Sequence, residues 1–187
     1  MQSENKFFKD VLIVALAVTL LLLIPLIAMF FSDQWNWGPF DFFLAWILLF
    51  SAGTTYKLTT RKSGNLAYKV AMGIAAATAL FLVWSNLAVG IIGSEDNPAN
   101  LMYLGVLAVL LIATFIASFK PERMALALTA TASAQVLVTA IALLGEMGAP
   151  ENTPVQLISI NGFFVVFWMA SALLFRYSTG ARSLASR

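Results

Sequence analysis

The sequence predicts an all-α, polytopic membrane protein: a bundle of six transmembrane helices arranged as three outward-pointing helical hairpins. Three observations lead to this fold class. Of the 187 residues 60% are hydrophobic and only 11% are charged, and the mean hydropathy is +0.87, whereas soluble domains are about a quarter charged. The apolar residues form six segments, and the basic residues lie in alternate connections between those segments. We expect a single six-helix membrane domain over residues 1–187.

Each apolar segment is long enough to cross a bilayer, whose hydrocarbon core requires roughly 20 helical residues. The second segment, with 17 residues, is short but within the range of a span. The predicted spans are 11–31, 40–56, 67–92, 101–119, 124–144 and 155–175.

The first segment has the basic flank of a signal peptide, in Lys6 and Lys9. Its 21 residues exceed a typical signal-peptide core, and Ala28, Met29 and Phe30 do not form a small-x-small cleavage site. We therefore expect an uncleaved first span.

The charged residues predict the orientation in the membrane. All 11 Lys and Arg residues lie in the amino-terminal segment, in or beside the second and fourth connections, or in the carboxyl-terminal tail. The first, third and fifth connections carry only acidic charge: Asp33, Asp41, Glu95, Asp96, Glu146 and Glu151. Because basic loops stay in the cytoplasm, both termini are expected there and the acidic loops outside.

In each outward hairpin, the second helix begins with a proline, then one further residue, then a residue whose side chain can accept a hydrogen bond. The acceptors are Asp41, Asn100 and Gln156. The pattern indicates either an internal repeat or the common needs of a helix start. In the third connection, Asn97 before Pro98 is typical of an N-cap, and Glu95 and Asp96 would face the positive end of the next helix.

Two amides are not explained by capping, because they fall inside predicted spans. Asn86 and Asn161 each lie about six residues from an outer helix end, or roughly 9 Å deep at 1.5 Å per residue. Such amides are expected to face protein or water rather than lipid. They could form a shallow polar pocket on the outer side, or could be hydrogen bonds that hold helices together. The candidate ligand-binding residues are Asp41, Asn86, Glu95, Asp96, Asn100, Gln156 and Asn161.

Gln135, near the centre of the fifth span, must also find a partner inside the bundle. It is interpreted as an interhelical hydrogen bond in preference to the floor of a polar path, because no second strongly polar residue is expected at its depth on a neighbouring helix.

The chain contains no His and no Cys. Thiolate and imidazole nucleophiles, structural zinc sites and disulfides are thereby excluded. We predict no catalytic residue and no cofactor; at most a hard cation could be held by oxygen ligands, and no particular metal is indicated. The net charge of +2 follows membrane topology, so no nucleic-acid partner is expected.

Aromatic residues gather around the first outer loop, where Trp35, Trp37 and Phe40 lie close in sequence. An interfacial belt is the usual role of such residues, and a surface for a partner protein or for lipid headgroups is the alternative. Tyr103 and Trp84 are expected in the same belt.

Residues 84–103, together with Trp-Asn-Trp-Gly-Pro-Phe-Asp-Phe at 35–42, resemble a group of small bacterial inner-membrane proteins. That group carries a similar Gly-Ile-Ile-Gly-Ser-Glu-Asp-Asn-Pro-Ala-Asn-Leu-Met-Tyr block, found here at 90–103. The resemblance implies a bacterial cytoplasmic-membrane location. It implies no activity and no residue roles.

Two functions are compatible with these patterns. The first is a non-enzymatic membrane protein that binds a small ligand, ion or lipid in the outer pocket, as a sensor, accessory subunit or passive transporter. The alternative is an assembly or stability subunit of a larger membrane complex, with a membrane-protein partner or a second copy of itself and with lipids as its surroundings. A membrane enzyme ranks third, because only carboxylates and hydroxyls would be available to it.

Overall fold

A computed structural model describes residues 2–31, 37–61 and 63–185 of the chain, with side chains described between 7 and 179. Over these ranges all regular structure is helical, and six helices are long and apolar enough to cross a membrane. This confirms the all-α class and the number of candidate spans.

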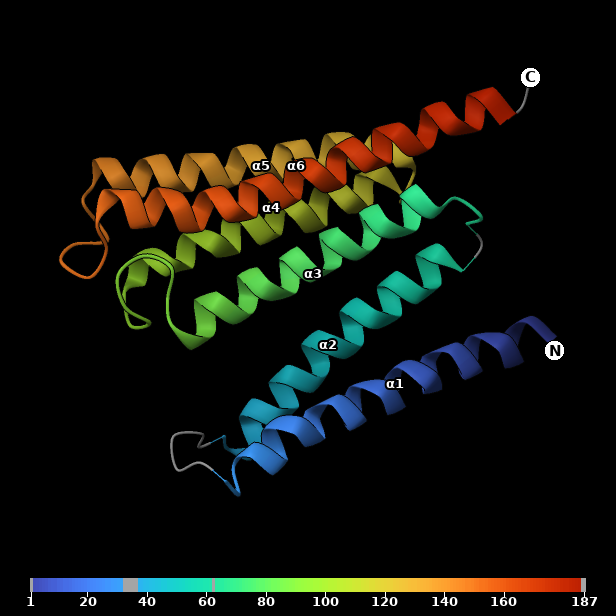
Figure 1. Cartoon of the computed structure of the whole chain (residues 1–187), viewed down its shortest axis with the longest axis horizontal. Helices are drawn as coiled ribbons and strands as arrows, with labels where there is room; N and C mark the ends of the chain where they lie inside the picture. The colour runs from blue at the N-terminus through green and yellow to red at the C-terminus, as the bar shows by residue number, and fades with distance from the viewer. Residues whose placement is uncertain (1, 32–36, 62, 186–187) are drawn as a thin grey trace. The chain divides into compact units, whose positions relative to one another are not determined.

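The chain divides into two compact units, residues 1–62 and residues 63–187 (Figure 1). Unit 1 consists of α1 (Gln2–Ala28) and α2 (Pro39–Thr60). The elements of unit 2 are α3 (Leu66–Ala88), the 3-10 turn η1 (Pro98–Leu101), α4 (Met102–Ala117), α5 (Pro121–Leu144) and α6 (Pro154–Ala185).

The helix ends differ from the predicted spans where local backbone chemistry outweighs hydropathy. The third helix ends at Ala88, not at residue 92, because Gly90 has a φ of 71° and leaves the helical region. The second helix continues past residue 56 to Thr60, and the first begins at Gln2. Hydropathy marks where a chain enters lipid, and a helix extends beyond that point wherever its backbone can still hydrogen-bond.

The helix starts follow the predicted capping chemistry. The Asp41 carboxylate accepts a hydrogen bond from the Gly38 N–H at 2.8 Å, at the start of α2. Asn97 caps η1 by accepting from the Ala99 N–H at 2.9 Å. At α6, Thr153 and Gln156 form a reciprocal capping box, in which the Thr153 N–H donates to Gln156 Oε1 at 2.9 Å. Asp41 and Gln156 thus satisfy backbone donors at helix starts.

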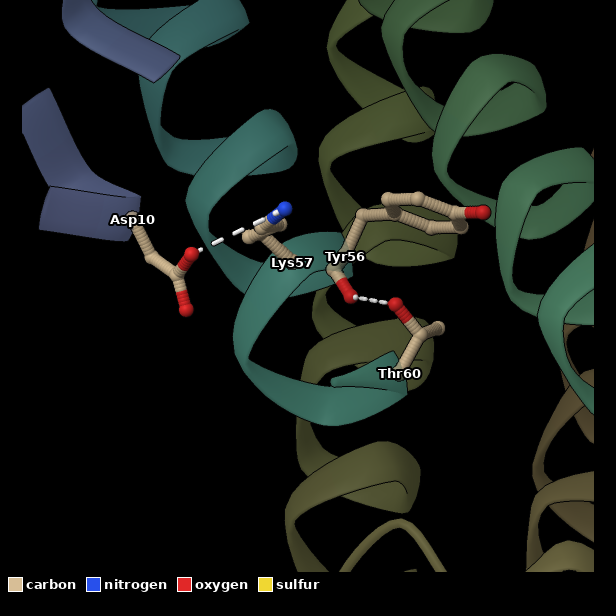
Figure 2. Close-up of polar contacts among 4 residues, drawn as sticks. All are labelled: Asp10, Tyr56, Lys57 and Thr60. Carbon is tan, nitrogen blue, oxygen red and sulfur yellow. Dashed lines mark hydrogen bonds and ion pairs between the residues drawn. The ribbon is translucent and has the colours of Figure 1, made fainter. Parts of the chain in front are cut away.

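Unit 1 is a helical hairpin whose two helices are antiparallel and held by polar contacts at two levels. The Trp46 indole N–H donates to Thr19 Oγ1 at 3.1 Å. Near the start of α1 and the end of α2, Lys57 Nζ lies 3.7 Å from Asp10 Oδ1 (Figure 2). Between these levels a Cβ on Gly53 would stand 2.9 Å from Val14 Cγ1, so the glycine lets the helices approach closely.

Near the end of α2, two threonine hydroxyls donate hydrogen bonds to carbonyls of the same helix. Thr60 Oγ1 donates to the Tyr56 carbonyl at 2.7 Å (Figure 2), and Thr59 Oγ1 donates to the Thr55 carbonyl at 2.7 Å. Both are bonds from a threonine hydroxyl to the carbonyl four residues earlier in the same helix, which is the usual way in which a helical threonine satisfies its hydroxyl.

In unit 2, α5 packs against both α4 and α6, and α6 packs against α3. The helices α3 and α4 follow one another in the chain, yet each packs mainly against another helix: α3 against α6 and α4 against α5. The predicted middle hairpin, α3 and α4, is therefore connected by its loop but has no extensive packing between its two helices.

On both α5 and α6 the buried residues are alternately three and four apart, which is the spacing of knobs-into-holes packing. On α5 the stripe is Met124, Leu128, Thr131, Gln135, Val138 and Ala142. On α6 it is Leu157, Asn161, Phe164, Trp168, Ser171, Phe175 and Ser178.

The two ends of unit 2 carry opposite charge. The loops 89–97 and 145–153 lie at one end (Figure 1) and contain Glu95, Asp96, Glu146 and Glu151 without any Lys or Arg. At the opposite end, the Tyr68 hydroxyl donates to the Phe119 carbonyl at 3.1 Å. This end carries the basic residues Lys120, Arg123 and Arg176. We call the first the acidic end and the second the basic end.

The close contact in unit 1 gives the first prediction. A V14C/G53C double variant should form a disulfide under mild oxidation, because the two positions face each other across the hairpin. Intact mass after alkylation with N-ethylmaleimide reports the loss of both free thiols. The matched control is L16C/G53C, since Leu16 lies on the exposed face of α1. Equal crosslinking of both pairs would contradict the register.

Candidate functional site

The loop 89–97 folds inward over the core of unit 2. Gly90 and Gly93 both have positive φ, 71° and 68°, and a Cβ on Gly90 would stand 2.4 Å from the Ser94 carbonyl oxygen. This turn directs Ile91 and Ile92 into the interior, where they are 1% and 0% exposed. The loop is therefore a built part of the core rather than a simple connection.

Asn100 holds this loop in place with its side-chain amide. Its Oδ1 accepts from the N–H groups of Ile91 and Ile92, each at 2.9 Å. Its Nδ2 donates to the carbonyls of Ile92 and Ser94, at 3.1 and 2.8 Å. The side chain is 5% exposed, and all four of its hydrogen-bonding positions are occupied by backbone. The Asn100 side chain therefore bonds to the loop before the cap residue Asn97 and not to Asn97 itself.

Two further asparagines tie the loops at the acidic end together. The Asn152 side-chain oxygen accepts from the Gly93 N–H, and Asn97 Nδ2 donates to the Met147 carbonyl at 2.7 Å. Glu95 and Asp96 are exposed beside these contacts. The acidic end is thus a hydrogen-bonded surface formed by two loops.

Asn86 lies nearer a helix end than predicted, because α3 ends two residues after it. Its Nδ2 donates to the Asn100 backbone carbonyl at 3.1 Å. Of the seven predicted ligand-binding residues, Asn86 and Asn100 are therefore brought together. Asp41 belongs to unit 1, Gln156 is an exposed capping residue, and Asn161 lies in a different cluster.

Asn161 is fully buried and joins three helices of unit 2. Its Oδ1 accepts two hydrogen bonds at 2.8 Å, one from the Tyr103 hydroxyl on α4 and one from Gln135 Nε2 on α5. Its Nδ2 donates to the Leu157 carbonyl on its own helix at 3.0 Å. Tyr103 and Gln135 are each 0% exposed. We call Tyr103, Gln135 and Asn161 the amide cluster.

The orientation of both amides in the cluster is fixed by this arrangement. The Leu157 carbonyl requires a donor, so Asn161 presents its NH₂ group there and its oxygen to Tyr103 and Gln135. Gln135 must then present its NH₂ group to Asn161. Its Oε1 accepts no hydrogen bond from any residue that the structure describes. A buried acceptor without a donor costs about 1–3 kcal/mol.

Two members of the amide cluster depart from the sequence-based expectation. Tyr103 is buried and hydrogen-bonded, not part of an interfacial belt. Gln135 does form an interhelical hydrogen bond, as predicted, but its partner is Asn161, a strongly polar residue at the same level on α6. The stripe spacing of Gln135 and Asn161 could have indicated this pairing, whereas nothing in the sequence distinguishes the buried Tyr103 from an interfacial one.

The remaining predicted features lie apart from the cluster. Trp37 packs edge-on against Phe42 at 5.2 Å between ring centroids, and Phe40 is exposed at the start of α2. Trp35 lies outside the described residues. Over the described parts of the chain, no three His, Cys, Asp or Glu side chains come close enough to hold one metal ion.

Comparison of the chain with protein-family models, with curated proteins and with solved structures finds no match. The fold and the site therefore define its class: a multi-pass helical protein with a neutral amide cluster buried between three of its helices.

The role of Asn100 gives the second prediction. Asn100→Ala leaves the N–H groups of Ile91 and Ile92 without their acceptor in a buried position. Because each unpaired group costs about 1–3 kcal/mol, thermal unfolding in mild detergent should show a loss of at least about 2 kcal/mol. Asp96→Ala, at an exposed position four residues away, is the control and should change stability little. An unaltered melting temperature in Asn100→Ala would show that the loop does not depend on this amide.

Proposed function

We propose that this chain is a non-enzymatic, multi-pass protein of a bacterial cytoplasmic membrane that binds a small neutral ligand at the amide cluster. In this role it acts as a sensor, an accessory subunit or a passive transporter. The observation that carries the proposal is Gln135 Oε1, a fully buried acceptor held in a fixed orientation with no donor among the described residues.

The chemistry of the cluster favours a neutral ligand over an ion. Tyr103, Gln135 and Asn161 carry no formal charge, and the charged residues of unit 2 lie toward its two ends. A ligand that donates one hydrogen bond to Gln135 would remove the cost of the unpaired acceptor. An ion would instead lose its hydration without an opposite charge to replace it.

The proposed site lies nearer the acidic end than the basic end. Asn161 follows the first residue of α6, Pro154, by seven positions, or about 10 Å of helix. The positive-inside rule supports an acidic end that faces outward and both termini in the cytoplasm. The ligand would then enter from the outer side. Its site would lie deeper in the membrane than the loop residues Glu95 and Asp96.

A second candidate function, an assembly or stability subunit, is favoured by the aromatic start of α2. Phe40 and Phe43 are 71% and 61% exposed there, beside Trp37. Phenylalanine lacks the polar group that suits Trp and Tyr to the membrane interface, so this surface fits an apolar face of a partner protein.

The orientation can be tested by cysteine labelling, since the chain has no native Cys. In intact cells, Ser94→Cys should react with a membrane-impermeant maleimide, whereas Ser63→Cys should react only after the membrane is opened. The physical reason is that an odd number of proposed spans separates the two positions. Labelling of both variants from the same side would contradict the proposed topology.

Ligand binding can be tested by native mass spectrometry of protein extracted in mild detergent. The wild-type protein should retain a bound mass that Gln135→Leu loses, because leucine has a similar volume and no acceptor. Ser133→Ala, an exposed hydroxyl on the same helix, is the matched control and should retain the mass.

Two results would overturn the ligand proposal. One is a wild-type protein with no bound mass, together with a Gln135→Leu variant that is as stable as wild type or more so. The other is a bound mass that persists in Gln135→Leu. A stoichiometric protein partner in the same spectra would instead support the assembly function.

A further inference from the structure

A second buried polar group in unit 2 also lacks a partner among the described residues. The indole N–H of Trp168 on α6 is at 0% exposure and donates to no described residue. Buried tryptophans normally find an acceptor for this group. Among the described buried side chains of unit 2 there is therefore one unpaired acceptor, at Gln135, and one unpaired donor, at Trp168.

These two groups lie along the same seam. Trp168 follows Asn161 by seven residues on the buried stripe of α6, which is two turns or about 10 Å of helix axis. Gln135 is at the level of Asn161, to which it is hydrogen-bonded at 2.8 Å. The unpaired acceptor and the unpaired donor therefore belong to the buried stripes of α5 and α6, about two helical turns apart.

The buried α5 residues about one turn beyond Gln135 toward the basic end are small. Thr131 and Ala132 are 0% and 3% exposed, and the Thr131 hydroxyl donates to the Ala127 carbonyl at 2.9 Å. Its oxygen retains lone pairs that can accept a further hydrogen bond. This stretch of the seam thus offers an acceptor at one end, a hydroxyl oxygen between, and a donor at the other end.

We propose that the seam between Gln135 and Trp168 binds neutral molecules through hydroxyl groups. This rests on the proposed function and names its ligand class. A hydroxyl group can act in both ways: one hydroxyl can donate to Gln135 Oε1, and another can accept from Trp168 Nε1. Because about two helical turns separate the two residues, the hydroxyls belong either to a short polyol or to a chain of water molecules.

The test uses protein labelled with ¹⁵N in its five tryptophans, each of which gives one indole N–H signal. The Trp168 signal is assigned with Trp168→Phe, or by replacing the other four in turn if that variant does not fold. Titration with 1,4-butanediol should shift this signal in a saturable manner. The diether 1,4-dimethoxybutane, which can accept from Trp168 but cannot donate to Gln135, should bind more weakly and shift the signal less at the same concentration. The Trp46 signal, from an indole bonded to Thr19 in unit 1, is the internal control.

The variants separate this inference from the proposed function. A diol-induced shift that Gln135→Leu abolishes supports a polyol ligand. Magnetisation transfer from water to the Trp168 N–H, without any diol response, supports water as the source of the hydroxyls and counts against a solute ligand. Equal responses to diol and diether, or no response to either diol or water, overturn the inference. A bound mass that needs Gln135 but is unchanged in Trp168→Phe overturns it while leaving the proposed function intact.

Discussion

Pairing of buried polar groups is the constraint on which unit 2 depends. In lipid there is no water to satisfy an exposed N–H or C=O group, so an irregular loop can enter the core only if side chains replace the missing partners. Asn100 supplies four hydrogen bonds to one such loop, and Gly90 and Gly93 give the backbone its turn. The polar block that looked like a ligand-binding motif is explained as the chemistry that seals this end of the helices.

The same constraint gives meaning to the groups that remain unpaired. The amide cluster uses Asn161 to bond two other helices, and this fixes Gln135 with its oxygen toward no described donor. Trp168, two turns away on the α6 stripe, presents the complementary unpaired donor. A neutral ligand at this seam would give both groups a hydrogen-bond partner. An apolar side chain at either position would have no polar group that requires such a partner.

The two units are stabilised in different ways. Unit 1 has a single helix–helix seam, held by close approach at Gly53 and by the Trp46–Thr19 and Lys57–Asp10 contacts. Unit 2 has three seams and a buried polar network that crosses from α4 through α6 to α5. A polar network that is shared by several helices restricts their register, which suits unit 2 to hold a specific site.

The sequence by itself determined the all-α class, the six membrane-length helices and the capping role of Asn97, because hydropathy and helix-start chemistry are local. It also identified Asn161 and Gln135 as amides that required partners. Only the tertiary structure decided which partners they have, that Tyr103 joins them, and that Asn100 turns back to the preceding loop. These choices depend on which helices lie side by side and at what register, and α3 packing against α6 rather than α4 is a relation between distant segments that no local pattern specifies.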